Sequence, residues 1–255
     1  MNESYKKICR DLTAMGIKKG DKLLVHSSYK SLGGVEGGIE TFIAALKDTV
    51  GEEGTLMLPT FTYDFVNKEN PVFNVNETPS CVGAVTEVFR HSEGVIRSVH
   101  PTHSLALWGK DKEWYAENHN EDDTCLGFNS PIYKLKERRG KVLLVGCGLT
   151  KNTILHGLEV HVKPPYSLAV DYSDPKYHRE YTCIDENGNS QTKEFFHVFA
   201  RESGYNHDFN KIGNIVELNP QKILEAECYL FDAYELWESV KKAMEKDPYC
   251  IARKL

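Results

Sequence analysis

The beginning of the chain alternates between apolar helical patterns and short apolar runs. Apolar positions recur at helical spacing over residues 4–15, and Gly16 follows as a stop signal. Residues 22–25 form a short apolar run, residues 39–50 return to helical spacing, and residues 55–58 form a second run. The order strand, helix, strand predicts a βαβ unit, which favours a three-layer α/β sheet.

The segment 61–79 differs from its surroundings, because it is aromatic and polar and has no clear period. Loops of this length are usually functional or mobile. The apolar pattern then returns. It predicts helices over 82–90, 113–118, 132–138 and 152–160, and strands over 104–108 and 141–145.

The texture changes after residue 165. Residues 177–184 and 191–196 alternate between apolar and polar positions and flank Asn187-Gly188, a sequence typical of a tight hairpin turn. An amphipathic helical pattern over 233–244 closes the chain, and no repeat, linker or low-complexity tract interrupts it. The whole pattern predicts one α/β domain over residues 1–255. We expect three α/β/α layers around a central mixed sheet, with a late antiparallel β-hairpin insertion.

Charge narrows the classes of partner. The formal net charge is −6 and the isoelectric point about 5.9, which disfavours a nucleic-acid binder, since such proteins usually carry a basic face. An acidic balance suits a cationic small molecule, although many ordinary cytoplasmic proteins are equally acidic.

Cysteine usage and the N-terminal sequence bear on location. The seven cysteines are odd in number and include no CxxC pair, which indicates reduced thiols in a reducing compartment. The first residues, MNESYKKICRDL, are polar and lack the apolar stretch of a signal peptide. Because no apolar run approaches ~18 residues, we expect a soluble, cytoplasmic protein that does not bind membranes.

The glycine-rich segment HSSYKSLGGVEGG follows the first predicted strand and leads into a helix. Backbone N–H groups at such a turn can bind an anion, and here Ser27, Ser28 and Ser31 add hydroxyl donors while Lys30 adds charge. A nucleotide-type phosphate would fit, but the segment is neither a Walker loop nor a GxGxxG motif. An ordinary turn remains the alternative interpretation.

Two further segments concentrate polar chemistry. HPTHS, residues 100–104, places two histidines, a threonine and a serine before a predicted strand, and its alternative interpretation is a surface loop. HGLEVH begins at His156 after an apolar strand and a glycine turn, where ligand sites of α/β proteins collect. On a helix, His156 and Glu159 are i,i+3 neighbours, so the histidine can act as a general base beside a carboxylate. A core histidine with a solvated glutamate is the alternative.

Rival chemistries lack their motifs. Neither HExxH nor HxxEH occurs, so a zinc hydrolase is disfavoured and no metal is expected. A serine hydrolase would need GxSxG, which is absent, and nothing local marks Cys147 as an activated thiol.

Four ordered blocks together resemble the aminoglycoside 3-N-acetyltransferase family. They are VHSSYKSLGGVEGG, RSVHPTHSLALWG, GFNSPIYKLKERRGKVLLVGCGLTKNTILHGLE and CYLFDA, within a span of residues 21–246. The family's enzymes transfer the acetyl group of acetyl-CoA to the 3-amino group of the 2-deoxystreptamine ring of aminoglycosides, which inactivates these antibiotics and gives resistance. They differ in fold from GNAT acetyltransferases and need no metal. The segment after residue 165 matches this pattern least.

The resemblance assigns site residues. It implies that His156 and Glu159 face the acceptor, with His156 as general base. It implies that the first loop and HPTHS contact CoA. The residues concerned are His26, Ser27, Ser28, Tyr29, Lys30, Ser31, Leu32, Gly33, His100, Pro101, Thr102, His103 and Ser104.

The expected mechanism follows from the chemistry of an amine. A primary amine is mostly protonated at neutral pH, and a histidine with an ordinary pKa near ~6.5 can accept its proton. Glu159 or Asp208 would orient the imidazole, and donors from the Ser27 loop or from residues 102–104 would hold the thioester oxyanion. Without an activated cysteine, we expect direct transfer in a ternary complex.

A polycationic acceptor predicts an acidic pocket. The candidates are Glu159, Asp171, Asp174 and the run Glu121–Asp122–Asp123, for which a solvated loop is the alternative. Two other functions remain open: the same acetyl-CoA chemistry on a different amine, and a CoA-binding protein without turnover. We expect a monomer or a homodimer.

Overall fold

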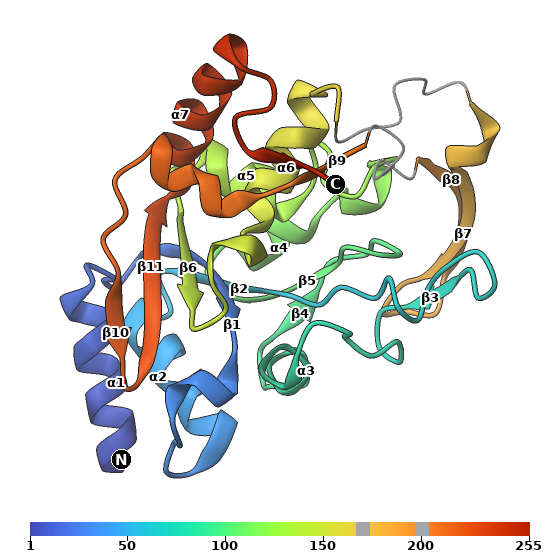
Figure 1. Cartoon of the computed structure of the whole chain (residues 1–255). Coiled ribbons are helices and arrows are strands. Elements are labelled where there is room, and N and C mark those ends of the chain that lie inside the picture. The colour runs from blue at the N-terminus through green and yellow to red at the C-terminus, as the bar shows by residue number, and fades with distance from the viewer. Residues whose placement is uncertain (167–173, 197–203) are drawn as a thin grey trace.

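A seven-stranded mixed sheet forms the centre of the computed structural model, which describes residues 1–166, 174–196 and 204–255 (Figure 1). Its strand order is β10-β11-β6-β1-β2-β5-β4. The middle strand, β1, pairs in parallel with both β2 and β6, and the outer strands add on in antiparallel pairs. The bounds are β1 Lys22–Ser27, β2 Thr55–Pro59, β4 Ile96–Arg97, β5 Leu105–Gly109, β6 Lys141–Val145, β10 Gln221–Ile223 and β11 Ala226–Asp232.

Seven α-helices of the described chain cover the two faces of this sheet. Helices α1 to α3 pack on one face and α4 to α7 on the other, as Figure 1 shows. Their bounds are α1 Glu3–Ala14, α2 Gly38–Val50, α3 Ala84–Arg90, α4 Lys112–Ala116, α5 Pro131–Glu137, α6 Thr153–Val162 and α7 Ala233–Lys246. The predicted α/β/α fold with a mixed central sheet is therefore confirmed.

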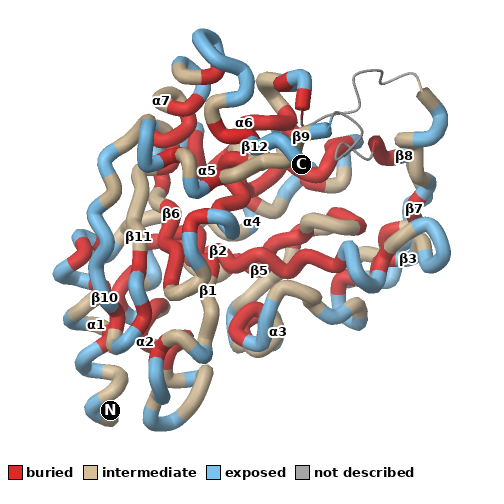
Figure 2. The backbone as a smooth tube through the Cα atoms, in the orientation of Figure 1, coloured by how far each residue is buried: buried red, intermediate tan, exposed pale blue. Residues whose placement is uncertain are grey.

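Alternation along β1 explains why both faces are covered. Leu23 and Val25 join the core under α1 and α2, whereas Leu24 joins the core under α5 and α6. All three side chains are fully buried, and Figure 2 shows the central strands as mostly buried. A central strand with two buried faces reads as a continuous apolar run rather than as an alternation, which is how the sequence presents it.

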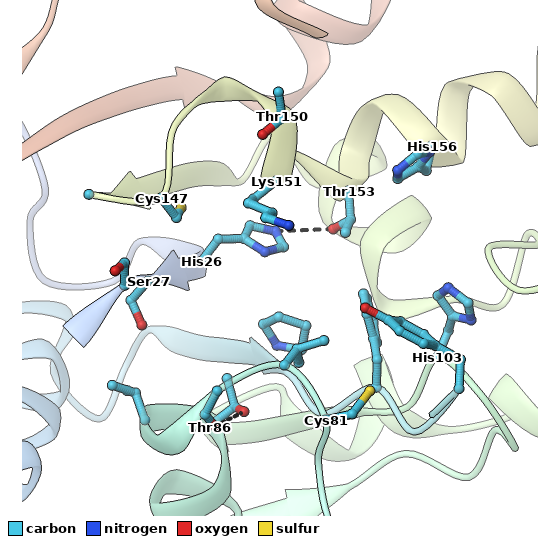
Figure 3. Close-up of a pocket in the computed structure, with 18 of the residues that line it drawn as sticks. His26, Ser27, Cys81, Thr86, His103, Cys147, Thr150, Lys151, Thr153 and His156 are labelled. Atoms are coloured by element: carbon cyan, nitrogen blue, oxygen red, sulfur yellow. Dashed lines mark hydrogen bonds between the residues drawn. The ribbon is translucent and has the colours of Figure 1, made fainter. Parts of the chain in front are cut away.

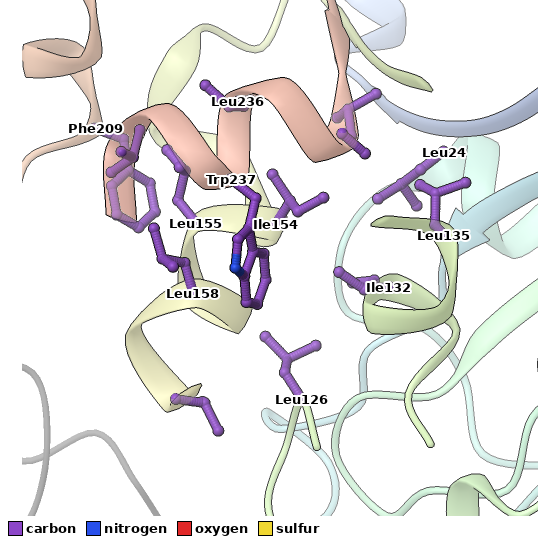
Figure 4. Close-up of a cluster of buried hydrophobic side chains, with 14 of the residues drawn as sticks. Leu24, Leu126, Ile132, Leu135, Ile154, Leu155, Leu158, Phe209, Leu236 and Trp237 are labelled. Carbon is purple, nitrogen blue, oxygen red and sulfur yellow. The ribbon is translucent and has the colours of Figure 1, made fainter. Parts of the chain in front are cut away.

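The core beneath the site is formed by three helices. Ile132 of α5, Leu155 of α6 and Trp237 of α7 meet in one buried cluster (Figure 4). Gly157 allows this close approach, because a Cβ there would lie 3.1 Å from the Trp237 ring. The packing fixes the direction of α6, the helix that carries His156.

The predicted hairpin is present as β7 His178–Ile184 and β8 Ser190–Phe196. It forms a separate three-stranded sheet with β3 Val72–Asn74, which pairs in parallel with β7. The sequence predicts only a loop at β3, because this short strand is defined by a partner far along the chain. Strand β9 Tyr205–His207, where the sequence pattern predicts no element, pairs with β12 Ala252–Lys254.

Short 3-10 helices complete the described elements, namely η1 Tyr29–Leu32, η2 His119–Glu121, η3 Leu149–Lys151, η4 Pro175–Tyr177 and η6 Phe209–Asn214. Two of them, η1 and η3, are the first elements after β1 and β6 of the central sheet. None of the helices in the described part of the chain combines the length and apolar character that crossing a bilayer requires.

Candidate active site

A cavity of about 1260 Å³ opens where β1, β2 and β6 end at their carboxyl termini. Ligand sites of open α/β sheets collect at this edge, because the loops that follow parallel strands converge there. Figure 3 shows Ser27 and Cys147 at one end of the cavity and His103 and His156 at the other. The remaining described lining includes His26, Ser28, Tyr29, Lys30, Pro59, Phe61, Tyr63, Cys81, Val82, Thr86, Thr150, Lys151, Thr153, Tyr166, Tyr205 and His207.

His156 and Glu159 form a hydrogen-bonded pair on the first turns of α6. The His156 Nδ1 and Glu159 Oε2 atoms are 2.9 Å apart, as expected for i,i+3 neighbours on one helix face. Glu159 is fully buried, whereas the His156 side chain is 20 % exposed and lines the cavity. An ionised carboxyl group can only accept a hydrogen bond, so a Glu159 carboxylate pairs with the tautomer of His156 that carries its proton on Nδ1.

Tyr166 supports the pair from behind. Its hydroxyl donates to Glu159 Oε1 over 3.0 Å, so both carboxylate oxygens have protein partners. Burial beside Glu159 raises the pKa of Tyr166, which therefore remains a donor. The buried carboxylate is thereby held in one orientation.

Aromatic rings surround His156 on its other side. The ring centres of His156 and His207 are 4.5 Å apart at 86°, and Phe209 lies 4.7 Å from His156 in a similar edge-on contact. His207 in turn stacks on Phe209 at 4.9 Å. These contacts fix the plane of the imidazole and bring a second histidine to the same end of the cavity.

His26 lies at the end of β1 and is nearly buried. Its Nε2 is 3.0 Å from Thr153 Oγ1, a contact drawn in Figure 3. Burial, together with the nearby His156, lowers the pKa of His26 to about 3, so this imidazole is neutral at physiological pH. It holds the first turn of α6 against β1 rather than accepting a proton.

The loop after β1 reaches the cavity only with its first residues. Residues 26–30 line the cavity, and the buried Ser27 hydroxyl has no hydrogen-bond partner in the described parts of the chain. Ser31 instead donates to the Gly146 carbonyl over 2.9 Å, and Leu32 is buried in the core. Gly33 adopts φ 78° and is not among the described lining residues.

The helix predicted after this loop is present as α2, but its first residues do not line the cavity. The chain turns into η1, and α2 begins only at Gly38, so the turn does not point the α2 N-terminus at the residues that line the cavity. Hydroxyls and Lys30, rather than a helix dipole, are what the loop offers to a ligand.

The HPTHS segment contributes mainly framework. His103 lines the cavity and packs against Phe61 at 4.6 Å, while the hydroxyl of Thr102 lies 2.8 Å from the His103 ring. Pro101 accepts a hydrogen bond from Thr62. Ser104 is buried, and its hydroxyl donates to the Thr60 carbonyl over 2.9 Å.

His100 is buried, and its ring hydrogen-bonds to backbone groups within that segment and beyond it. Its Nδ1 accepts the backbone N–H groups of Thr102 and His103 at 3.2 and 3.0 Å, and its Nε2 lies 3.1 Å from the Thr124 carbonyl. Burial beside His119 holds its pKa well below the usual range. Contact of His100, Pro101 and Ser104 with CoA stays a prediction from the resemblance.

The acidic candidates are dispersed. Asp122 is buried and accepts the Asn129 backbone N–H at 3.0 Å, Asp174 accepts from the Lys176 backbone, and Asp208 accepts from the Asn210 side chain. Asp171 lies outside the described residues. No described residue in the cavity lining is an aspartate or a glutamate, and the lining includes Lys30 and Lys151. Among the described candidates, Glu159 is hydrogen-bonded to His156, a residue that lines the cavity.

The thiols in the lining are poor nucleophiles. Burial raises the pKa of Cys147 to about 11 and also raises that of Cys81. A thiol that stays protonated at neutral pH cannot readily form an acyl-enzyme. Neither of these two thiols is therefore an activated nucleophile.

Several lining residues lay outside the sequence prediction. The aromatic loop after β2 supplies Phe61 and Tyr63, and its unusual length and composition were the available signal. Tyr166 and His207 carried no local signal, since each reaches the His156–Glu159 pair only through the fold.

A mixed α/β sheet with a histidine–carboxylate pair in a cavity at its carboxyl edge defines an α/β ligand-binding or group-transfer protein. The family model described as aminoglycoside 3-N-acetyltransferase matches residues 24–245. The chain thus belongs to the aminoglycoside 3-N-acetyltransferase family.

Three relatives illustrate the likeness. The SPbeta prophage-derived aminoglycoside N(3')-acetyltransferase-like protein YokD of Bacillus subtilis (strain 168) is 32% identical over 92% of this chain and 90% of its own. Its crystal structure superimposes with a TM-score of 0.79 over 97% of this chain and 95% of that chain. Aminoglycoside N(3)-acetyltransferase VII of Streptomyces paromomycinus is 35% identical over 66% of this chain and 64% of its own. The structure of AAC-IIIb binary with CoASH is 26% identical, with a TM-score of 0.77 and coverage of 95% and 96%.

Proposed function

We propose that this protein transfers the acetyl group of acetyl-CoA to the 3-amino group of the 2-deoxystreptamine ring of aminoglycosides. His156 is the general base, and transfer is direct, without an acyl-enzyme. The single observation that carries the proposal is the hydrogen bond between His156 and the buried Glu159 at the cavity of a family member.

Cavity size supports a ternary complex. Pockets for one drug-sized ligand occupy roughly 300–1,000 Å³. The cavity of about 1260 Å³ is larger, so the donor thioester and an amine can occupy it together. Protonated thiols at Cys81 and Cys147 support the same conclusion, since neither favours a covalent intermediate.

In the proposed reaction one imidazole, that of His156, takes up a proton and later returns it. The ammonium form of the acceptor first loses a proton to solvent. The neutral amine nitrogen then attacks the thioester carbon while His156 Nε2 takes up the second proton from that nitrogen. Collapse of the intermediate breaks the carbon–sulfur bond, and the imidazolium returns the proton to the leaving CoA sulfur. Glu159 stabilises the imidazolium during this interval, since opposite charges attract strongly away from water.

A serine hydroxyl and two lysines in the lining are suited to binding acetyl-CoA. The buried Ser27 hydroxyl has no partner among the described residues, which supports a role as hydrogen-bond donor to the developing oxyanion. Lys30 and Lys151 add positive charge to the lining, which suits the phosphates of CoA. The relative AAC-IIIb, solved with CoASH, is consistent with a donor of this kind.

A second acceptor class is supported by one observation. Because the described lining holds lysines and no acidic side chain, a neutral or anionic amine would meet less repulsion there than a polycation would. This alternative retains acetyl-CoA and His156 but changes the acceptor. The third function, CoA binding without turnover, is opposed by the ordered His156–Glu159 pair.

A thiol-release assay separates these functions. The protein is incubated with acetyl-CoA and a panel of aminoglycosides, neutral amines and anionic amines, and products are identified by mass spectrometry. Thiol release with a 3-N-acetylated aminoglycoside supports the proposal. Release only with other amines assigns the second function, and CoA binding without release under any condition assigns the third. His156→Ala serves as the matched control for catalysed release.

A further inference from the structure

His156, Glu159 and His207 form a cluster of metal-ligand type at one end of the cavity. Each offers one ligand atom, and these atoms all lie within 4.8 Å of one another. The histidines come from α6 and β9, elements far apart in the sequence, and both line the cavity. The cluster is therefore reachable by a small ion from solvent.

Two histidines and one glutamate are a ligand set that Zn²⁺ uses in proteins. Zinc sites with an open position use three protein ligands, among them two histidines and a glutamate, and bind at about 2.0–2.2 Å. Tetrahedral ligands at such distances lie roughly 3.3 Å apart, so the 2.9 Å separation of His156 Nδ1 and Glu159 Oε2 needs to widen only slightly. His207 needs to move closer.

An outer contact already orients the carboxylate. Tyr166 holds Glu159 Oε1, which leaves Oε2 directed at His156. Hydrogen bonds from such supporting groups fix the direction of metal ligands and strengthen binding. The pair is thus preorganised to exchange its shared proton for a cation.

We propose that these three residues form a Zn²⁺ site and that bound Zn²⁺ inhibits the enzyme. The ion replaces the proton on His156 Nδ1, which is released to solvent, and takes a nitrogen of His207 as its third ligand. Water fills the fourth position. The metal plays no part in catalysis, and its inhibitory effect, unlike its binding, rests on the proposed role of His156.

Binding is tested without the reaction. Metal-free protein is titrated with Zn²⁺ in competition with a chromogenic chelator, and proton release is measured in weak buffer. We expect one equivalent to bind with release of a proton. His207→Ala and Glu159→Gln should each weaken binding about tenfold or more, the lower end of what supporting groups alone contribute.

His103→Ala is the matched control, because it also removes a cavity histidine but one outside the cluster. It should keep the wild-type Zn²⁺ affinity. His207→Ala remains decisive if Glu159→Gln, at a buried position, does not fold. Equal affinity in His207→Ala and wild type would overturn the proposal, as would failure to bind Zn²⁺.

Co²⁺ distinguishes this site from one made by the seven cysteines. Nitrogen and oxygen ligands give visible d–d bands alone, whereas thiolates add an intense near-ultraviolet charge-transfer band. A thiolate band would refute the assignment. Inhibition of acetyl transfer by Zn²⁺, reversed by a chelator, is the last arm; binding without inhibition would overturn the inhibitory part while leaving the proposed function untouched.

Discussion

Two pairs of side chains that each contain a histidine differ in chemistry. His156 contacts the carboxylate of Glu159 and lines a cavity. His100 instead stacks on His119 at 4.8 Å and 28°, and both of these rings are buried. The first pair joins a cavity-lining imidazole to a buried carboxyl group, and the second places two buried imidazole rings face to face.

The chemistry open to each histidine depends on the groups that its ring contacts. His100 Nδ1 already accepts two backbone N–H groups, so proton uptake there would break contacts that hold the loop. His156 is hydrogen-bonded instead to the buried carboxyl group of Glu159. Burial lowers the pKa of His119 to about 3, which reinforces the neutral state of the second pair.

The largest effect is expected for the variant His156→Ala. Loss of the base should lower kcat by about 10² or more, because general-base catalysis contributes 10²–10⁴ in rate. The measurement is steady-state kinetics alongside acetyl-CoA binding, which should persist. Near-wild-type turnover would end the assignment of His156 as base.

His100→Ala should instead act on stability. It strands the backbone groups of Thr102, His103 and Thr124 that the imidazole satisfies, at a cost of about 2–3 kcal/mol in unfolding free energy. Chemical denaturation of this variant and the wild type measures the loss. An unchanged midpoint for His100→Ala would remove the framework role.

The neutral histidines also predict acid sensitivity. Burial lowers the pKa of His26 and His119 to about 3, so below ~6.5 the unfolded chain binds protons that the folded chain does not. Stability should therefore fall as pH drops from 6.5 toward 3, by about 2 kcal/mol per histidine at pH 5. His119→Asn should reduce the slope of the unfolding free energy against pH over this range, measured by chemical denaturation at several pH values. An unchanged slope would contradict the neutral state of His119.

The smallest effect concerns the charged lining. Lys30 and Lys151 are exposed, and exposed charge interactions amount to about 0.2–1 kcal/mol, so removing either should raise the KM for acetyl-CoA by roughly 1.4- to 5-fold. The increase should shrink at high salt, because ions screen exposed charges. Kinetics at two ionic strengths test this, with Lys222→Ala, exposed on β10, as the control. A salt-independent change would exclude electrostatic steering.

Local pattern sufficed for much of this molecule. The strand predicted over 141–145 has the bounds of β6, because its apolar run stops at a glycine. The i,i+3 spacing of His156 and Glu159 predicted a shared helix face, and the hydrogen bond between them confirms it.

Other features depend on contacts that local patterns do not encode. His207 reaches His156 because β9 pairs with β12 near the end of the chain. In HPTHS, dense polarity suggested a binding loop, yet the His100 ring satisfies backbone groups whose need for partners appears only after folding. The sequence also predicted an acidic pocket, but the described lining of the cavity contains no aspartate or glutamate.

The central sheet ends in very short strands, and this has a consequence for behaviour in a crowded solution. Strand β4 has two residues and β10 has three. Long open edges would offer backbone groups to a second molecule and seed intermolecular sheets. Here Arg97 of β4 donates inward to Thr60, and exposed Gln221 and Lys222 mark the opposite edge, so neither margin is a template for aggregation.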